Sequence, residues 1–205
     1  MTSKQHRAAE GGPPKYSYRG AVCIRELLTA DECEQVRRLV DWSDVKSGTI
    51  GSDEFVVRSV RRHGVVWLPR DPGSEWFYKK FSDILHAINA RYFGYDIEGL
   101  DGSLQFSQYE PGQFYDWHQD IGPGRHSYRK LSGVVMLSAP SDYRGGGLRF
   151  SEMAMCVPEA EAALIHAPPQ GSVVAFPSFQ LHRVQPTETG VRQSVVGWMA
   201  GPTFR

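Results

Sequence analysis

The most informative stretch of this sequence is YEPGQFYDWHQD, residues 109–120. It ends in a His-x-Asp pattern, and residues two apart on a strand point to the same side of a sheet. His118 and Asp120 can therefore present an imidazole nitrogen and a carboxylate oxygen to one point. A second histidine from a neighbouring strand would complete a metal-binding face. His182 fits this role, because it follows the strand expected at residues 172–176.

Short β-type runs surround this stretch, and Gly- or Pro-bearing turns separate them. The runs lie at residues 104–109, 131–137, 147–150, 172–176 and 193–199. Several short strands with turn signals and no intervening helices are typical of an antiparallel sandwich or barrel. The expected fold is mainly β with flanking helices around a jelly-roll core.

The N-terminal half is expected to supply helices and outer strands. Residues 29–32, TADE, form a capping box, which predicts a helix to about Asp41. A second helix is predicted to open at Asp71-Pro72, because aromatic and aliphatic residues recur at helical spacing from Trp76 to Ile88. The other elements expected here are a strand at 21–24, a loop at 43–53, and strands at 55–60 and 65–68.

Composition points to an ordinary globular protein. The chain has 205 residues, which suits one domain. Its formal net charge of +0 gives no indication of the basic surface that nucleic-acid-binding proteins carry. Its 3 cysteines show no C-x-x-C spacing, and the polar N-terminus has no apolar signal core. No apolar run approaches the roughly 20 residues of a membrane span. We expect a cytoplasmic protein of undetermined oligomeric state.

Two histidines and one carboxylate on one face leave three metal positions open. This is the facial arrangement of non-haem iron(II) oxygenases. Zinc would accept the same ligands, but a structural zinc site usually closes with four protein ligands. In an oxygenase, a 2-oxo acid takes two of the open positions through its keto oxygen and the adjacent carboxylate, and dioxygen takes the third.

The distal carboxylate of such a 2-oxo acid needs an anchor. A forked, permanently charged donor suits that task, which favours arginine. Arg192 lies ten positions after His182 on the next predicted strand, and Ser194 shares its strand face and can add a hydroxyl donor.

The His-x-Asp pair alone is a weak signal, because it occurs often by chance. The order of all the motifs is far more specific: Tyr109, His118-x-Asp120, Gly145-Gly146-Gly147-Leu148, His182 and Arg192-x-Ser194. The glycine run has a plainer interpretation of its own, a tight turn that needs positive φ.

These motifs resemble the prolyl-4-hydroxylase-like branch of the iron(II)/2-oxoglutarate-dependent dioxygenases, including the bacterial PKHD-type hydroxylases. Residues 109–120 resemble the Y-E-x-G-Q-x-Y-x-x-H-x-D stretch of prolyl hydroxylases. Residues 138–146, SAPSDYRGG, resemble the PKHD segment L-S-x-P-x-D-Y-x-G-G, and residues 176–184, FPSFQLHRV, resemble Y-P-x-x-x-L-H-R-V. The resemblance covers about residues 104–201.

The resemblance implies specific roles. Three residues would ligate iron(II): His118, Asp120 and His182. Arg192 would pair with the distal carboxylate of 2-oxoglutarate, Tyr109 would donate a hydrogen bond to the same molecule, and Trp198 would lie near iron and substrate. The co-substrates implied are 2-oxoglutarate and dioxygen, with ascorbate as a supporting reductant.

The resemblance also implies a double-stranded β-helix fold and an organisation of the chain. Residues 1–16 are expected to be a disordered tail and residues 17–205 one oxygenase domain. Within it, residues 17–100 would supply helical support and outer strands, and residues 101–205 the catalytic jelly-roll core. The implied reaction is hydroxylation of an unactivated C–H bond in a small-molecule or peptide substrate, with an amino acid, free or within a peptide or natural product, as the favoured class.

The collagen-type branch has lysine at the anchor position, where this chain has Arg192, so collagen-type substrates are not favoured. Oxygenases that act on alkylated nucleic-acid bases carry a second arginine six residues further on, where this chain has Trp198. Cupin-type binding modules favour several histidines and a glutamate as ligands. Halogenases replace the carboxylate ligand with a small residue, whereas Asp120 is present.

Several nearby residues have competing interpretations. Tyr115 could pack or line the site, and Trp117 is expected in the core because it alternates with the ligands. His126 lies in a Gly/Pro-rich loop just after the ligands and could contact substrate. Three arginines of one N-terminal segment could bind an acidic group of a substrate, but a solvated face is the default interpretation: Arg58, Arg61 and Arg62. His63 is interpreted as structural.

Overall fold

Two antiparallel sheets pack face to face in the computed structural model, which describes residues 20–47, 60–151 and 159–204. The larger sheet has the spatial order β1 (Val22–Ile24), β11 (Val173–Pro177), β8 (Arg129–Met136), β14 (Arg192–Ala200), β6 (Leu104–Tyr109), β4 (Gly64–Leu68) and β2 (Lys46–Ser47), with β5 (Gly99–Leu100) beside β14. The smaller sheet has the order β10 (Leu148–Phe150), β12 (His182–Val184), β7 (Phe114–His118) and β3 (Arg61–Arg62). A separate ribbon pairs β13 (Thr187–Gly190) with β9 (Tyr143–Gly145).

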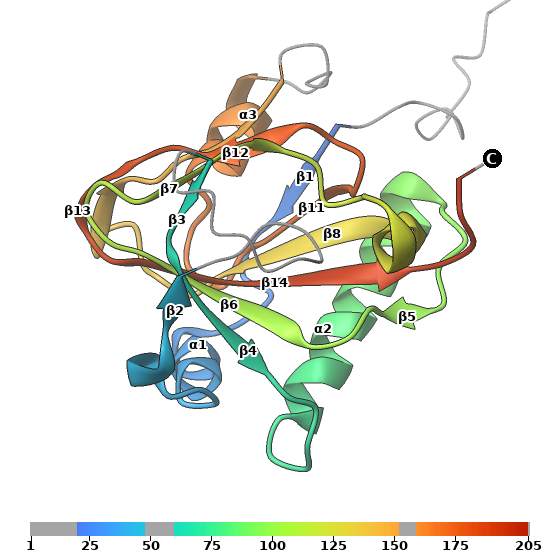
Figure 1. The fold of residues 1–205 in the computed structure, drawn as a ribbon, viewed down its shortest axis with the longest axis horizontal. Helices are drawn as coiled ribbons and strands as arrows, with labels where there is room; N and C mark the ends of the chain where they lie inside the picture. Colours follow the sequence, from blue (N-terminus) through green and yellow to red (C-terminus); the bar gives the residue numbers. More distant parts are fainter. Residues whose placement is uncertain (1–19, 48–59, 152–158, 205) are drawn as a thin grey trace, which may run out of the picture.

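The helices lie mainly outside the larger sheet. In Figure 1, α1 (Ala30–Arg37) and α2 (Glu75–Ile88) lie on one side of that sheet, and β7 and β12 lie on the other. The third helix, α3 (Glu159–His166), contacts β1 and β10. Short helical turns complete the described part: η1 (Trp42–Asp44), η2 (Asn89–Phe93) and η3 (Gly124–Tyr128). This architecture is the expected double-stranded β-helix with flanking helices.

The two faces of the larger sheet have different chemistry. On β14, Val195 pairs with Phe106 on one side and Val135 on the other, and all three join the apolar cluster shared with α1 and α2. Ser194, the residue before Val195, pairs with Ser107. Because successive residues of a strand point to opposite faces, both serine side chains point to the other face of the sheet. That face is the floor of the cavity between the sheets.

The α1 helix confirms the predicted capping box. The Thr29 hydroxyl accepts a hydrogen bond from the Glu32 backbone N–H (3.1 Å), and the Glu32 carboxylate accepts one from the Thr29 N–H (2.9 Å). The regular helix ends at Arg37 and therefore stops short of the predicted end near Asp41.

The α2 helix packs very closely on the middle of the larger sheet. Gly133 and Gly197 lie opposite each other on β8 and β14. A Cβ atom at Gly133 would lie 2.6 Å from Leu85, and one at Gly197 would lie 2.7 Å from Phe81. The absence of side chains at these two positions therefore lets the helix approach the sheet backbone.

Phe81 is the central side chain of that contact and is fully buried. We expect Phe81→Ala to lower the free energy of unfolding by about 3–5 kcal/mol, because the lost burial leaves a cavity against two glycines that cannot fill it. Urea denaturation would measure the change. Lys79→Ala is the matched control on the same helix, because Lys79 forms only an exposed ion pair with Asp83, worth about 0.5 kcal/mol. Equal losses in both variants would contradict this packing role.

Some predicted elements differ from the structure. The α-helix begins at Glu75, so Pro72 lies in the turn before it and not in its first turn. The strands of the C-terminal half are interrupted by α3, which sequence periodicity did not reveal. The loop predicted at 43–53 contains η1 and β2 where it is described. The predicted tail at 1–16 and nearly all of the strand predicted at 55–60 lie outside the described residues.

None of the helices in the described ranges combines the length and the hydropathy that crossing a bilayer requires.

Candidate metal centre

Three side chains from two adjacent strands and one loop converge inside the cavity. His118 is the last residue of β7, and His182 is the first residue of β12. The two histidines are paired in the register of these strands. Asp120 lies two residues beyond the end of β7, so it reaches the same point from a loop and not from the strand itself. The sequence predicted this convergence, although not the end of the strand at His118.

The distances between these three side chains suit a shared cation. The Nε2 atoms of His118 and His182 each lie 3.8 Å from a carboxylate oxygen of Asp120. Ligands about 2.1 Å from one ion are at most about 4.2 Å apart, so these separations are within reach of coordination. One donor atom from each of the three residues lies within 4.8 Å of the others, and they form a group that could hold a metal ion.

Backbone hydrogen bonds orient both imidazoles. His118 Nδ1 lies 2.7 Å from the Asp116 carbonyl oxygen, and His182 Nδ1 lies 2.8 Å from the Gln180 carbonyl oxygen. A carbonyl only accepts, so each Nδ1 carries the proton and donates it. Each Nε2 is left with its lone pair directed toward the carboxylate, the tautomer that a metal needs.

The Asp120 carboxylate is also held from behind. The Ser132 hydroxyl donates to Oδ2 of Asp120 at 2.6 Å and lies 3.0 Å from the Ser178 hydroxyl. The Asp120 backbone N–H donates to the Ser178 carbonyl at 2.9 Å. The side chain and the backbone of Asp120 are therefore both fixed before any ligand arrives. Such outer-shell hydrogen bonds are typical of metal-binding sites in proteins.

The electrostatics keep His118 and Asp120 in their metal-binding protonation states. Burial lowers the pKa of the His118 imidazole far below its ordinary value, and the neighbouring His182 lowers it further. Burial alone would raise the pKa of the Asp120 carboxyl. The two imidazoles and the Ser132 hydrogen bond outweigh that effect and hold the pKa below its ordinary value. A neutral imidazole beside a carboxylate is the state that accepts a divalent cation.

A cavity of about 950 Å³ opens in front of these side chains, between the two sheets. Pockets for small molecules commonly measure about 300–1,000 Å³, so this one has room for a co-substrate and part of a second molecule. The residues that the sequence singled out all line it: Tyr109, His118, Asp120, His182, Arg192, Ser194 and Trp198.

Arg192 brings a buried positive charge into this cavity. It is 1% exposed, its Nη1 donates to the Ser194 hydroxyl at 3.1 Å, and its Nη2 lies 3.4 Å from the Met136 sulfur. Within the described ranges it forms no ion pair with a carboxylate. A buried guanidinium is costly unless an anion pairs with it, so this arrangement favours binding of an anionic ligand.

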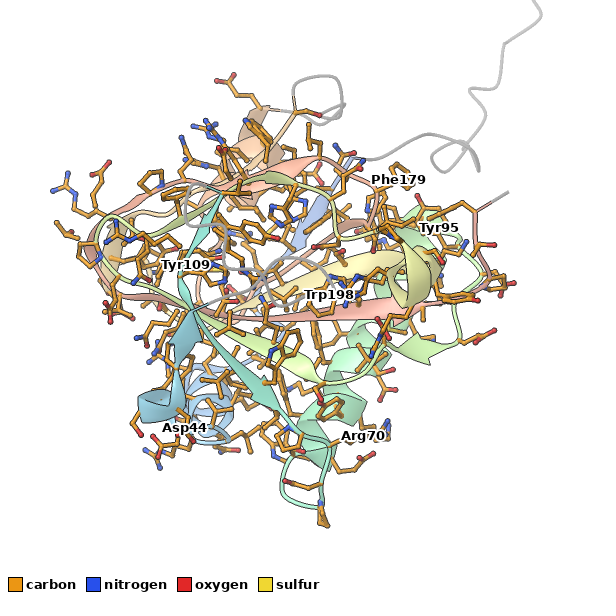
Figure 2. All side chains as sticks on the ribbon, in the orientation of Figure 1. Asp44, Arg70, Tyr95, Tyr109, Phe179 and Trp198 are labelled. Atoms are coloured by element: carbon orange, nitrogen blue, oxygen red, sulfur yellow. The ribbon has the colours of Figure 1, made fainter. Side chains whose placement is uncertain are left out.

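Tyr109 and Trp198 flank the centre, and Figure 2 labels both. The Arg192 guanidinium carbon lies 5.2 Å from the centre of the Tyr109 ring. Burial raises the pKa of Tyr109 to about 12, so the phenol keeps its proton and can donate a hydrogen bond. The Trp198 indole is buried under the Arg129 guanidinium, 3.8 Å from the ring centre. Its N–H makes no hydrogen bond of ordinary geometry with the described residues, but it is close enough to the Asp120 carboxyl to help lower the pKa of that group.

The structure decides between interpretations that the sequence left open. Arg61, for which a solvated face was the default, is 7% exposed and lines the cavity. Tyr115 also lines the cavity, and its ring stacks on His118 with the centres 3.4 Å apart. The expectation that Trp117 belongs to the core is wrong, because its side chain is 40% exposed and lies under Arg183. The pairing of β3 with β7 places Arg61 beside Tyr115, and nothing local in the sequence predicts it.

Comparison with known proteins assigns this constellation to a family. The family model described as "2OG-Fe(II) oxygenase superfamily" matches residues 104–200. Residues 104–200 form a 2OG-Fe(II) oxygenase domain. The oxygenase domain thus spans β6 to β14 and contains all three residues of the candidate metal group. The family implies iron(II), 2-oxoglutarate and dioxygen as the reacting partners.

A PKHD-type hydroxylase of Synechococcus sp. (strain JA-2-3B'a(2-13)) is 27% identical over 187 residues, which is 87% of this chain and 77% of that protein. Shorter matches at 39–41% identity cover 40–42% of the length of other cyanobacterial PKHD-type hydroxylases. Their names support a hydroxylase as the kind of oxygenase.

Solved structures show the fold. A prolyl-4-hydroxylase of Pseudomonas putida superposes with a TM-score of 0.66 at 22% identity, over 90% of this chain and 94% of that one. A prolyl hydroxylase of Trichoplax adhaerens, solved with a hypoxia inducible factor peptide, gives a TM-score of 0.67 at 19% identity. This match covers 89% of this chain and 84% of that one.

Proposed function

We propose that this oxygenase hydroxylates an unactivated C–H bond of an amino acid, free or within a peptide or natural product. In this proposal His118, Asp120 and His182 hold iron(II). Arg192, Tyr109 and Ser194 hold 2-oxoglutarate, and Trp198 borders the position of the substrate. One oxygen atom of dioxygen enters the substrate and the other enters succinate, while carbon dioxide leaves.

The observation that carries the proposal is the pairing of two features in one cavity. A group of three donors that leaves three metal positions open lies beside a buried arginine that forms no ion pair in the described part of the chain. A dicarboxylate that chelates the metal at one end and meets Arg192 at the other would complete both. A site for a structural zinc ion would need neither the open positions nor the arginine.

The chain's own residues have clear tasks in this scheme. The Nδ1–H bonds of the two histidines fix the direction of their metal-binding lone pairs, and Ser132 fixes the carboxylate of Asp120. The protonated phenol of Tyr109 donates a hydrogen bond to 2-oxoglutarate. Arg192 is 1% exposed, so little bulk water reaches its guanidinium, and this strengthens the charge pairing there. Iron supplies the oxygen chemistry when it is bound.

The first test is a turnover assay. Purified protein with iron(II), ascorbate and 2-oxoglutarate is expected to release succinate, and the rate should rise when a true substrate is added. A screen of amino acids, peptides and peptide-derived natural products would identify that substrate by a mass gain of one oxygen atom. Absence of both iron binding and succinate release would reject the oxygenase assignment in favour of a binding module with the same fold.

A further inference from the structure

The cavity contains a second buried arginine, Arg61, which the proposed function leaves without a task. It is the first residue of β3, at the edge of the smaller sheet, and its neighbour Arg62 is exposed. The Arg61 side chain is 7% exposed and lines the same cavity as His118 and Asp120. A permanent positive charge is therefore presented to the space in front of the metal group.

The guanidinium of Arg61 is fixed in place by its surroundings. Its Nη2 donates to the Gln105 side-chain oxygen at 2.9 Å, and the Gln105 amide donates to the Ser107 hydroxyl at 2.9 Å. The guanidinium carbon lies 4.7 Å from the centre of the Tyr115 ring. Such a preorganised, planar donor loses little further entropy when it binds a carboxylate in a forked geometry.

His63 contributes to this fixation and stays neutral. Burial lowers the pKa of the His63 imidazole well below its ordinary value, and the charge of Arg61 lowers it further. Its Nε2 lies 3.3 Å from Nη2 of Arg61 and can accept a hydrogen bond from it. His63 therefore adds no positive charge of its own beside Arg61.

Two rings separate Arg61 from Arg192. The Tyr109 ring lies next to the Arg192 guanidinium, and the His63 ring stacks on Tyr109 with the centres 4.3 Å apart. Arg61 meets the His63 ring at its edge, where Nη2 of Arg61 lies 3.3 Å from Nε2 of His63. The proposed function assigns one carboxylate of 2-oxoglutarate to the metal and the other to Arg192, so an anion at Arg61 would belong to a different molecule.

Arg61 lies close to the position of oxidation. The distance from its guanidinium carbon to the Tyr115 ring centre is 4.7 Å, and the Tyr115 and His118 ring centres are 3.4 Å apart. The guanidinium is therefore no more than about 8 Å from the His118 ring. A carboxylate bound there would place only the next few carbon atoms of its molecule beside the metal.

Part of the cavity wall is apolar, beginning beside Gln105, which pairs in register with Trp67. Trp67 on β4 is 52% exposed and lines the cavity, and its ring centre lies 6.2 Å from that of Trp198. Ile121 and Pro123, which follow Asp120 in the sequence, line the same cavity. A substrate with one anionic end and an apolar body would match both the arginine and this wall.

We propose that Arg61 binds a carboxylate of the prime substrate and is a specificity-determining residue of this oxygenase. The substrate class is then a carboxylic acid that is oxidised a few bonds from its carboxylate. The carboxylate comes either from a free amino acid or from an acidic side chain of a peptide. This inference rests on the proposed function, because it assigns the substrate of that same site.

The test measures binding without turnover, in protein loaded with iron(II) and 2-oxoglutarate under nitrogen. The probes are matched pairs in two panels. One panel compares free amino acids with their C-terminal amides, and the other compares capped peptides containing Asp or Glu with those containing Asn or Gln. Titration calorimetry gives each dissociation constant. We expect the acid in at least one panel to bind on the order of 10- to 100-fold more tightly than its amide, and that panel identifies the source of the carboxylate.

Variants then attribute the preference to Arg61. Arg61→Gln should remove the preference for acid over amide, and Arg61→Lys should keep part of it. The dissociation constant for 2-oxoglutarate should stay unchanged in Arg61→Gln, which a general loss of structure would not allow. Arg62→Gln, on the exposed face of the same strand, is the matched control and should behave as the wild type.

Two results would overturn the inference. One is a full preference for the acid in Arg61→Gln, and the other is a lack of preference for acids in both panels. Failure of the proposed function looks different, because wild-type protein would then neither bind 2-oxoglutarate under nitrogen nor release succinate in air.

Discussion

Asp120→Ala is expected to lose bound iron and all iron-dependent turnover while the protein stays folded. The change removes one of three ligands, and loss of a mere outer-sphere contact already costs about 10- to 100-fold in metal affinity. Without the carboxylate, two neutral imidazoles remain, which hold iron(II) poorly and leave its charge uncompensated. Metal analysis after anaerobic loading and the succinate assay would measure the two losses.

The fold should survive this change for a structural reason. The Ser132 hydroxyl, which loses its acceptor on Asp120, still lies 3.0 Å from the Ser178 hydroxyl and can bond there. The Asp120 backbone bond to Ser178 does not involve the side chain. The melting temperature should therefore change little.

Asp116→Ala is the matched control for this experiment. Asp116 lies four residues earlier, and its carboxylate is about half exposed, 3.9 Å from Arg183. It should bind iron and release succinate as the wild type does. Turnover retained in Asp120→Ala, or lost equally in Asp116→Ala, would remove Asp120 from the ligand set.

Local chemistry explains why the metal group could be predicted from the sequence. Coordination needs particular residue types, and their order along the chain survives whatever lies between them. His118 and Asp120 are only two residues apart, so their convergence depends on local geometry alone. His182 follows β11, and the pairing of β12 with β7 then places it beside His118.

The rest of the cavity depends on long-range pairing that no local pattern encodes. Arg61 looks like any surface arginine in the sequence, next to the exposed Arg62. It enters the cavity because β3 pairs with β7 and because Gln105 on β6 accepts its hydrogen bond across 44 positions of the chain. Helix α3 was missed for a related reason, since a segment dominated by alanine and glutamate shows little apolar periodicity.

Arg192→Gln is expected to raise the concentration of 2-oxoglutarate that half-saturates the enzyme by roughly 30-fold or more. Removing one partner of a buried, hydrogen-bonded charge pair costs roughly 2–5 kcal/mol, and each 1.4 kcal/mol is a factor of ten. The loss should be large here because Arg192 is 1% exposed, so the charge pair forms where water screens it little. Iron affinity in the absence of 2-oxoglutarate should stay close to the wild-type value, since Arg192 is not a ligand.

Arg192→Lys separates charge from geometry at the same position. Lysine keeps the positive charge but offers no planar fork. We therefore expect a smaller rise in the 2-oxoglutarate requirement than in Arg192→Gln. Arg183→Gln, at a partly exposed arginine over Trp117, is the control and should leave the requirement unchanged.

Titration of 2-oxoglutarate in the succinate assay, beside direct binding under nitrogen, distinguishes the two possible origins of such a defect. A larger dissociation constant for 2-oxoglutarate with an unchanged maximal rate means that Arg192 only holds the co-substrate. A lower maximal rate at saturation means that it also aligns the 2-oxo group with the metal. An unchanged requirement in Arg192→Gln would reject the anchor role, and the buried guanidinium beside Ser194 and Met136 would then have to serve another anion.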